Sequence, residues 1–197
     1  EIERIVAAWA DGPPDVVLAG TSVVVGSAAT VVSPSTAAAS EPGPMVRPIE
    51  GSILVVCGSV HPAARRQVGF AEHRGVPVAS IADDITAREL QRHGALVLVT
   101  EIPVGDVSEP MAIAAATSLA RGATDLVAQV DLGAMVVIGG DTATAVLGDT
   151  RVRVLGSLGP GEALVEADRF DMPIVTRSGG FGPDHALVDL LSRMRGA

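Results

Sequence analysis

The sequence predicts a three-layer α/β fold, in which a mostly parallel sheet carries helices on both faces. Three observations support this prediction. Short runs rich in Val, Leu and Ile alternate with helix-like segments along most of the chain. Apolar residues make up 48% of the 197 residues, whereas aromatic residues make up only 2%, so the core must be aliphatic. Buried parallel strands covered by Ala-rich helices suit that composition.

The apolar runs place the strands, and the segments between them place the helices. Strands are expected at 52–57, 76–81, 95–100, 134–139, 152–158 and 172–176. A loop and helix should follow the first strand, and a short helix should lie within 83–94. A long Ala-rich helix should end near Val130, and the last helix should run from about Pro183 to Met194. Such alternation is typical of βαβ units with parallel strands.

A segment rich in Pro, Ser and Ala at 33–50 marks the expected domain boundary. This composition favours a linker or surface excursion over a packed element. We therefore expect one domain over 50–197, preceded at 1–49 by a helix and strand-like runs that belong to another domain.

Charge and cysteine content exclude several classes of partner. The net charge is −9, so a general nucleic-acid or anionic-membrane partner is not expected, because both need a basic face. Backbone N–H groups can still hold the phosphates of a small nucleotide. The single cysteine, Cys57, lies in an apolar run and is expected to be buried, in keeping with a reducing cytoplasm. No signal peptide and no apolar run near the roughly 18 residues of a membrane span are evident.

Three junctions share one design, in which glycine and a hydroxyl residue stand between an apolar strand and a helix. They are CGSVHP (57–62), IGGDTATA (138–145) and RSGGFGPD (177–184). In a parallel sheet all three would lie at the carboxyl ends of strands, where ligands bind. Free N–H groups at the helix starts favour phosphate, and Ser59, Thr142 and Ser178 could add hydroxyl donors. Each junction alone could be plain turn chemistry, but three together favour an anion site. None of them matches a P-loop or a Rossmann fingerprint.

These residues resemble a known family. VVCGSVHPAARRQV (55–68), GGDTATAVL (139–147) and RSGGFGPDHAL (177–187) are similar to the C-terminal nucleotide-binding domain of four-carbon acid sugar kinases, formerly the DUF1537 family. LGSLGPGEAL (155–164) also fits in order, and the resemblance covers roughly residues 50–195. It implies ATP and Mg²⁺ as cofactors and threonate, erythronate or 3-oxo-tetronate as the acceptor.

The resemblance also implies which residues contact ATP. The implied set, with the neighbours that the glycine junctions add, is Ser59, Gly139, Gly140, Asp141, Thr142, Arg177, Ser178, Gly179, Gly180 and Gly182. Two departures from the family pattern bear on affinity. Arg177 stands where the family usually has lysine, and His61 stands where it usually has serine or threonine. Arginine keeps the positive charge but lacks the compact ammonium group.

Members of this family are about twice as long as this chain. Their N-terminal domain carries an Asp-Asp-x-Thr-Gly-Ala motif, which the resemblance links to the acid sugar and the catalytic base. Residues 1–49, including GSAA (26–29), are expected to be the tail of that domain plus the linker. The similar IADDITA (81–87) is interpreted as a coincidence, because it follows the second strand of the nucleotide domain.

The expected function is the ATP-binding portion of a kinase for a four-carbon acid sugar, with its catalytic base outside this chain. The expected partners are the nucleotide, the acid sugar and an N-terminal substrate domain in the same or a separate chain; self-association is left open. The alternative is a non-catalytic module that binds a nucleotide or another anion. A phosphate-dependent lyase would need a nucleophile or base that the chain does not offer.

Several other polar residues have either a functional or a structural interpretation. Asp141 could orient Mg²⁺ or a ribose hydroxyl, or could equally be the N-cap of a helix starting at Thr142. Glu101 and Asp106 would lie at the ligand edge, although a solvated loop is favoured for both. The four histidines show no metal-ligand spacing, and no metal site made by the protein alone is expected. His73 and His93 are expected at exposed helix ends, His185 beside the last glycine loop, and Arg65 and Arg66 on a solvated helix face.

Overall fold

A computed structural model describes residues 2–13, 31, 48–81, 87–101 and 108–196. The chain divides into two compact units, Glu1–Gly43 and Pro44–Ala197. In the first unit, helix α1 spans Ile2–Ala10 and buries Val6. The second unit contains the sheet and all three glycine junctions. The expected GSAA element at 26–29 lies outside the described residues.

The second unit is built on one sheet of seven strands in the order β2-β3-β1-β4-β7-β6-β5. The strands are β1 Ser52–Cys57, β2 Val78–Ser80, β3 Ala95–Val99, β4 Leu132–Ile138, β5 Val152–Gly159, β6 Glu162–Ala167 and β7 Ile174–Arg177. From β2 to β7 in this order all neighbours are parallel. β6 is antiparallel to both β7 and β5. The predicted mostly parallel sheet is therefore confirmed.

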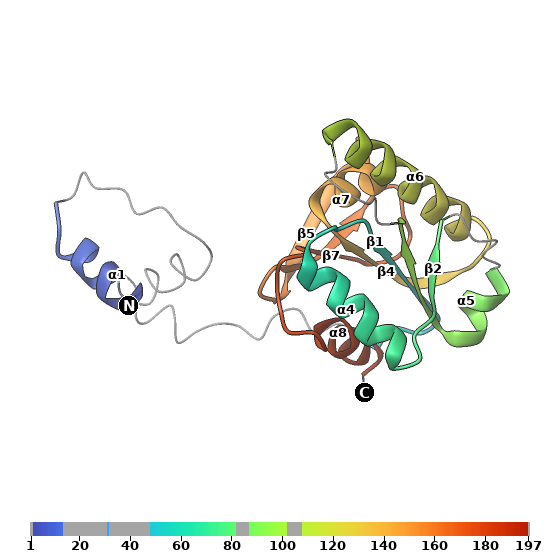
Figure 1. Cartoon of the computed structure of the whole chain (residues 1–197), viewed down its shortest axis with the longest axis horizontal. Coiled ribbons are helices and arrows are strands. Elements are labelled where there is room, and N and C mark those ends of the chain that lie inside the picture. Colours follow the sequence, from blue (N-terminus) through green and yellow to red (C-terminus); the bar gives the residue numbers. More distant parts are fainter. Residues whose placement is uncertain (1, 14–30, 32–47, 82–86, 102–107, 197) are drawn as a thin grey trace. The chain divides into compact units, whose positions relative to one another are not determined.

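Helices cover both faces of the sheet and complete the three layers (Figure 1). On one face lie α4 Pro62–His73 and α8 Ala186–Arg195, which contact each other. On the other lie α5 Ala87–His93, α6 Glu109–Val127 and α7 Gly140–Leu147, of which α6 and α7 pack side by side. Within the described ranges, no helix is both long and apolar enough to cross a bilayer.

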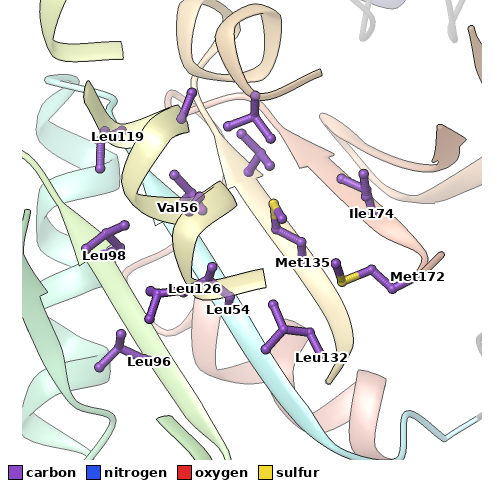
Figure 2. Packing of buried hydrophobic residues seen from close by; sticks show 14 of the residues in the cluster. Leu54, Val56, Leu96, Leu98, Leu119, Leu126, Leu132, Met135, Met172 and Ile174 are labelled. Atoms are coloured by element: carbon purple, nitrogen blue, oxygen red, sulfur yellow. The ribbon is translucent and has the colours of Figure 1, made fainter. Parts of the chain in front are cut away.

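The two faces of the central strands bury two separate aliphatic clusters. Alternate residues of β1 point to opposite faces: Leu54 and Val56 face α6, whereas Ile53 and Val55 face α4 and α8. Figure 2 shows the α6 side, where Leu119 and Leu126 of the helix pack over strand residues of β1, β3, β4 and β7. This two-sided burial explains why the central strands are continuous apolar runs. It also holds the carboxyl ends of these strands in fixed positions.

The main difference from the sequence prediction is β6. In the sequence, 155–164 resembles a family motif, and its first four residues belong to the strand predicted at 152–158. In the structure it forms the end of β5, a tight turn and the start of β6, which pair as a β-hairpin. Gly161, with φ of +73°, lies in this turn. The last helix starts at Ala186, three residues later than predicted, because 178–185 forms a loop. The remaining strands lie where the apolar runs predicted them, with shifted ends.

Candidate functional site

The three glycine junctions leave the sheet side by side. Their strands β1, β4 and β7 are neighbours, and the last residues pair in register: Cys57 with Ile138, and Ile138 with Arg177. The backbone N–H of Gly58 donates to the Ile138 carbonyl (3.3 Å), and that of Gly139 donates to the Arg177 carbonyl (3.0 Å). The three strands therefore end at the same level. This confirms the prediction that all three junctions lie at the carboxyl ends of the parallel strands.

The junctions also interlock, each using a glycine to admit a hydroxyl residue of another. A Cβ at Gly58 would overlap the Thr142 hydroxyl. A Cβ at Gly179 would overlap the Ser59 hydroxyl and lie 2.6 Å from its Cβ. Gly139 has a φ of +113°, and a Cβ added to it would lie 3.3 Å from the backbone nitrogen of Ser59. Real Cβ atoms do not approach as closely as at Gly58 and Gly179, and a side chain at Gly139 would be strained by its positive φ, so glycine at these positions lets the junctions pack together.

The first junction is closed by His61, which is the N-cap of α4. Its Nδ1 accepts a hydrogen bond from the Ala63 amide (3.2 Å), and Pro62 occupies the first helical position. The Ser59 hydroxyl accepts from the His61 amide (3.3 Å). Because Nδ1 is an acceptor here, the neutral ring carries its proton on Nε2. His61 thus takes the capping role for which serine or threonine is usual.

Replacing His61 with alanine should destabilise the fold by about 1 kcal/mol, because the Ala63 amide loses its side-chain acceptor. His61→Ser should remain close to the unaltered protein, since serine is a preferred N-cap residue. Urea unfolding of the two variants measures the difference. Equal stability of His61→Ala and His61→Ser would show that the cap contributes nothing.

The second junction starts α7 without a side-chain cap. Gly139 is the N-cap and Gly140 the first helical residue, so Asp141 lies inside the first turn. The alternative interpretation of Asp141 as an N-cap before Thr142 is therefore wrong. Asp141 is exposed and Thr142 is buried against Gly58. A Cβ at Gly140 would meet nothing within 4 Å, so this residue borders open space.

The third junction is a loop fixed by side chains that donate to its carbonyls. Gln67 of α4 is buried, and its Nε2 donates to the carbonyls of Phe181 (2.8 Å) and Gly182 (3.1 Å). Arg177 donates to the same Phe181 carbonyl (3.0 Å). The Ser178 amide donates to the Gly161 carbonyl in the β5–β6 turn (3.0 Å). Ser178 and Gly180 remain exposed at the surface of this fixed loop.

The Arg177 side chain is buried in an ion pair and does not extend into solvent. Its Nε lies 3.3 Å from Glu162 Oε1, and the two side chains are 2% and 6% exposed. Glu162 also pairs with Arg193 of α8 (2.9 Å). Burial lowers the pKa of Arg177, and the nearby Glu162 carboxylate opposes that shift. Among the described residues, no hydrogen-bond partner is found for its buried Nη1. Arg177 therefore links β6 to the third junction.

Two hollows meet at Gly139 and Gly140. One, of about 300 Å³, lies between the first two junctions, the end of β3 and the start of α6. Its walls include Ser59, His61, Thr100, Glu101, Met111, Asp141 and Thr142. The other, of about 560 Å³, lies toward the β5–β6 hairpin and is lined by Ser157, Glu162, Thr176, Arg177 and Ser178, among others. All three junctions therefore border one or both hollows.

The other polar residues considered in the sequence lie partly at this edge and partly away from it. Glu101 lines the first hollow and is exposed, whereas Asp106 lies outside the described residues. His73 and His93 are exposed last residues of α4 and α5, as predicted. His185 is the N-cap residue of α8, exposed and 3.5 Å from Asp189. None of these histidines lines either hollow.

Two neighbouring arginines of α4 differ in exposure. Arg66 is exposed and pairs with Asp184 of the third junction (2.9 Å). Arg65 is half-buried, and its Nε and Nη2 are buried without a hydrogen-bond partner among the described residues. The expected solvated face is therefore wrong for Arg65. Cys57 is buried as predicted, and burial raises the pKa of its thiol against the opposing charges of Arg65 and Arg177.

The chain is similar to known proteins in sequence and in fold. The D-threonate kinase of Salmonella typhimurium (strain LT2) is 27% identical over 175 residues, covering 71% of this chain and 41% of that protein. A DUF1537 structure from Bordetella bronchiseptica, a domain-swapped dimer with bound citrate, is 28% identical with a TM-score of 0.61. It covers 75% of this chain and 40% of that one. This chain thus spans about two fifths of the length of these two relatives.

A DUF1537 protein of Haemophilus influenzae is similar in fold alone, with a TM-score of 0.55 at 18% identity, covering 99% of this chain and 50% of that one. Residues 54–187, more than half of the chain, match the family described as the nucleotide-binding C-terminal domain. The matched range contains all three junctions, the glycines that line the two hollows, and the Arg177–Glu162 ion pair. The chain therefore belongs to the family of nucleotide-binding C-terminal domains, the part of the four-carbon acid sugar kinase family that its glycine motifs resemble.

Proposed function

We propose that this chain binds Mg·ATP at the edge formed by its three glycine junctions and is the nucleotide-binding part of a four-carbon acid sugar kinase. The observation that carries the proposal is the interlocking of the three junctions at the level ends of β1, β4 and β7. Such an edge is where open parallel sheets bind ligands. Membership of a nucleotide-binding family supports the same ligand class.

The phosphates are assigned to the start of α7. This helix has no side-chain cap, so its first-turn N–H groups are free to bind an anion. Gly140 borders open space on both hollows, and Ser178 and Gly180 are exposed on the facing loop. Ser59 and Thr142 pack the junctions together, and they add hydroxyl groups at the same edge. Fixed donors of this kind stabilise the charge that develops during phosphoryl transfer.

We propose that Arg177 holds the third junction in place and does not itself contact the phosphates. The guanidinium group donates to the Phe181 carbonyl and pairs with Glu162, so it holds Ser178 to Gly182 in place. It is a cation at the end of β7, beside the second hollow. In this role arginine replaces the usual lysine without needing to reach a phosphate.

Mg²⁺ is proposed to bind together with the nucleotide. Asp141 and Glu101 line the same hollow, and both are exposed. Mg²⁺ commonly takes one or two carboxylates plus phosphate oxygens. In the part of the chain that the structure describes, no group of three or more His, Cys, Asp or Glu residues could hold a metal ion. The two carboxylates fit a metal that the phosphates help to bind.

Transfer to a sugar acid such as D-threonate is proposed for the chain together with an N-terminal substrate domain, which would supply the catalytic base. This proposal rests on the resemblance and on the D-threonate kinase relative. ADP formation that requires both the sugar acid and that domain would support it. Nucleotide binding without such turnover would favour the alternative, a non-catalytic binding module.

Calorimetric titration with Mg·ATP tests the binding site directly. The unaltered chain should bind saturably, and Gly140→Val should weaken binding at least tenfold, since the side chain would enter the open space at the start of α7. Gly69→Val is the matched control, because Gly69 on α4 also has nothing within 4 Å but lies away from both hollows. Equal ATP affinity in Gly140→Val and Gly69→Val would contradict the proposed site.

A further inference from the structure

One wall of the first hollow is aliphatic and has no part in the proposed phosphate binding. Val60 and Met111 both line it, and they are 53% and 48% exposed. Ala112 and Ala115 of α6 continue this wall. It faces Gly139–Thr142, the start of α7. One hollow therefore has a free helix start on one side and an aliphatic surface on the other.

The exposed aliphatic side chains need an explanation because the domain has a well-formed core elsewhere. Val60 lies within the first junction, and Met111 lies in the first turn of α6. The two residues are 51 positions apart in the sequence, yet they border the same hollow of about 300 Å³. Ligand pockets of this size are mostly apolar with a few polar groups. Methionine adapts well to a flat ligand face.

We infer that Val60 and Met111 form the nucleobase contact of the nucleotide site, with the triphosphate extending toward Gly140. The inference rests on the proposed function and adds the orientation of the nucleotide. A sugar acid has no apolar face to cover this wall, whereas a purine ring does. Both faces of a purine are apolar, so the contact recognises the ring without depending on hydrogen bonds to its edge.

The inference separates two parts of the ligand that can be measured independently. Removing the aliphatic wall should weaken binding of ATP but leave binding of inorganic tripolyphosphate unchanged, because tripolyphosphate carries no base. Met111→Ala and Val60→Ala should each weaken ATP binding several-fold, and the double variant about tenfold or more. Thermal unfolding should show all variants folded, since both side chains are half exposed.

Ile113 offers a matched control on the same helix. It is 55% exposed, lies two residues after Met111 and does not line the hollow. Ile113→Ala should therefore bind both ATP and tripolyphosphate as the unaltered chain does. It controls for the general effect of removing an exposed aliphatic side chain from α6.

The experiment is calorimetric titration of Mg·ATP and Mg·tripolyphosphate into the unaltered chain, Val60→Ala/Met111→Ala and Ile113→Ala. A loss confined to ATP in the double variant is the expected result. Equal effects on both ligands, or no effect on either, would overturn the nucleobase contact while leaving a phosphate site at Gly140 intact. If the unaltered chain binds neither ligand, the proposed function fails, and the inference fails with it.

Discussion

Replacing Gly179 with alanine is expected to destabilise the domain and weaken nucleotide binding at the same time. The new Cβ would overlap the Ser59 hydroxyl and lie 2.6 Å from the Ser59 Cβ. Both atoms belong to short, fixed groups, so the first and third junctions would have to separate. Overpacking of this kind typically costs about 1–3 kcal/mol. ATP affinity should fall at least tenfold, because the junctions no longer meet at one edge.

The control for this prediction is Gly69→Ala. Gly69 lies within α4, is exposed, and would meet nothing within 4 Å. Alanine there should stabilise the helix by up to about 1 kcal/mol. The combined Ser59→Gly/Gly179→Ala variant should recover much of the lost stability, because it exchanges the side chains across the contact. Additive losses in the combined variant, measured by urea unfolding, would show that the two junctions do not pack as described.

Replacing Glu162 with glutamine should be among the most destabilising changes in the domain that keep side-chain size. The Arg177 guanidinium would remain buried without its counter-charge, and removing one partner of a buried pair typically costs about 3–5 kcal/mol. Arg193 would also lose its carboxylate partner. The third junction should loosen, because Arg177 holds the Phe181 carbonyl. Chemical denaturation measures the first effect, and hydrogen exchange of 178–182 measures the second.

A surface ion pair in the same hairpin provides the comparison. Arg153 and Glu166 pair across β5 and β6, with side chains 72% and 48% exposed. Exposed pairs contribute about 0–1 kcal/mol, so Glu166→Gln should change stability little. A Glu162→Gln variant as stable as Glu166→Gln would mean that Arg177 is not held by this pair in solution.

The edge of the sheet could be predicted from local sequence, because each glycine junction follows an apolar strand directly. The contacts within it could not. Glu162 lies 15 residues before Arg177 and stands out in the sequence only as part of a family motif, yet the two residues pair in register on β6 and β7. The hairpin had a turn signal, since Gly159, Pro160 and Gly161 separate two short runs that contain Val and Leu. Gln67 gave none, because its partners are the carbonyls of Phe181 and Gly182, over a hundred residues away.

The roles of the individual junction glycines could be assigned only from the structure. The sequence alone offers turn chemistry or ligand approach for every junction glycine and does not distinguish one glycine from another. The structure separates Gly58 and Gly179, which make room for Thr142 and Ser59, from Gly140, which borders open space. Val60 and Met111 were not predicted as site residues, because a single aliphatic residue beside a turn is indistinguishable from core in sequence. Their shared hollow is visible only after folding.

Amide chemical-shift mapping with ¹⁵N-labelled chain and Mg·ATP tests the central claim most directly. The account predicts that the largest shifts fall on the three junctions together, at Ser59, Gly139–Thr142 and Ser178–Gly180. A hollow of similar size at the opposite edge of the sheet is lined by residues 127–132 and 169–172. Shifts concentrated there, with the junction amides unmoved, would contradict a nucleotide site built from the glycine junctions.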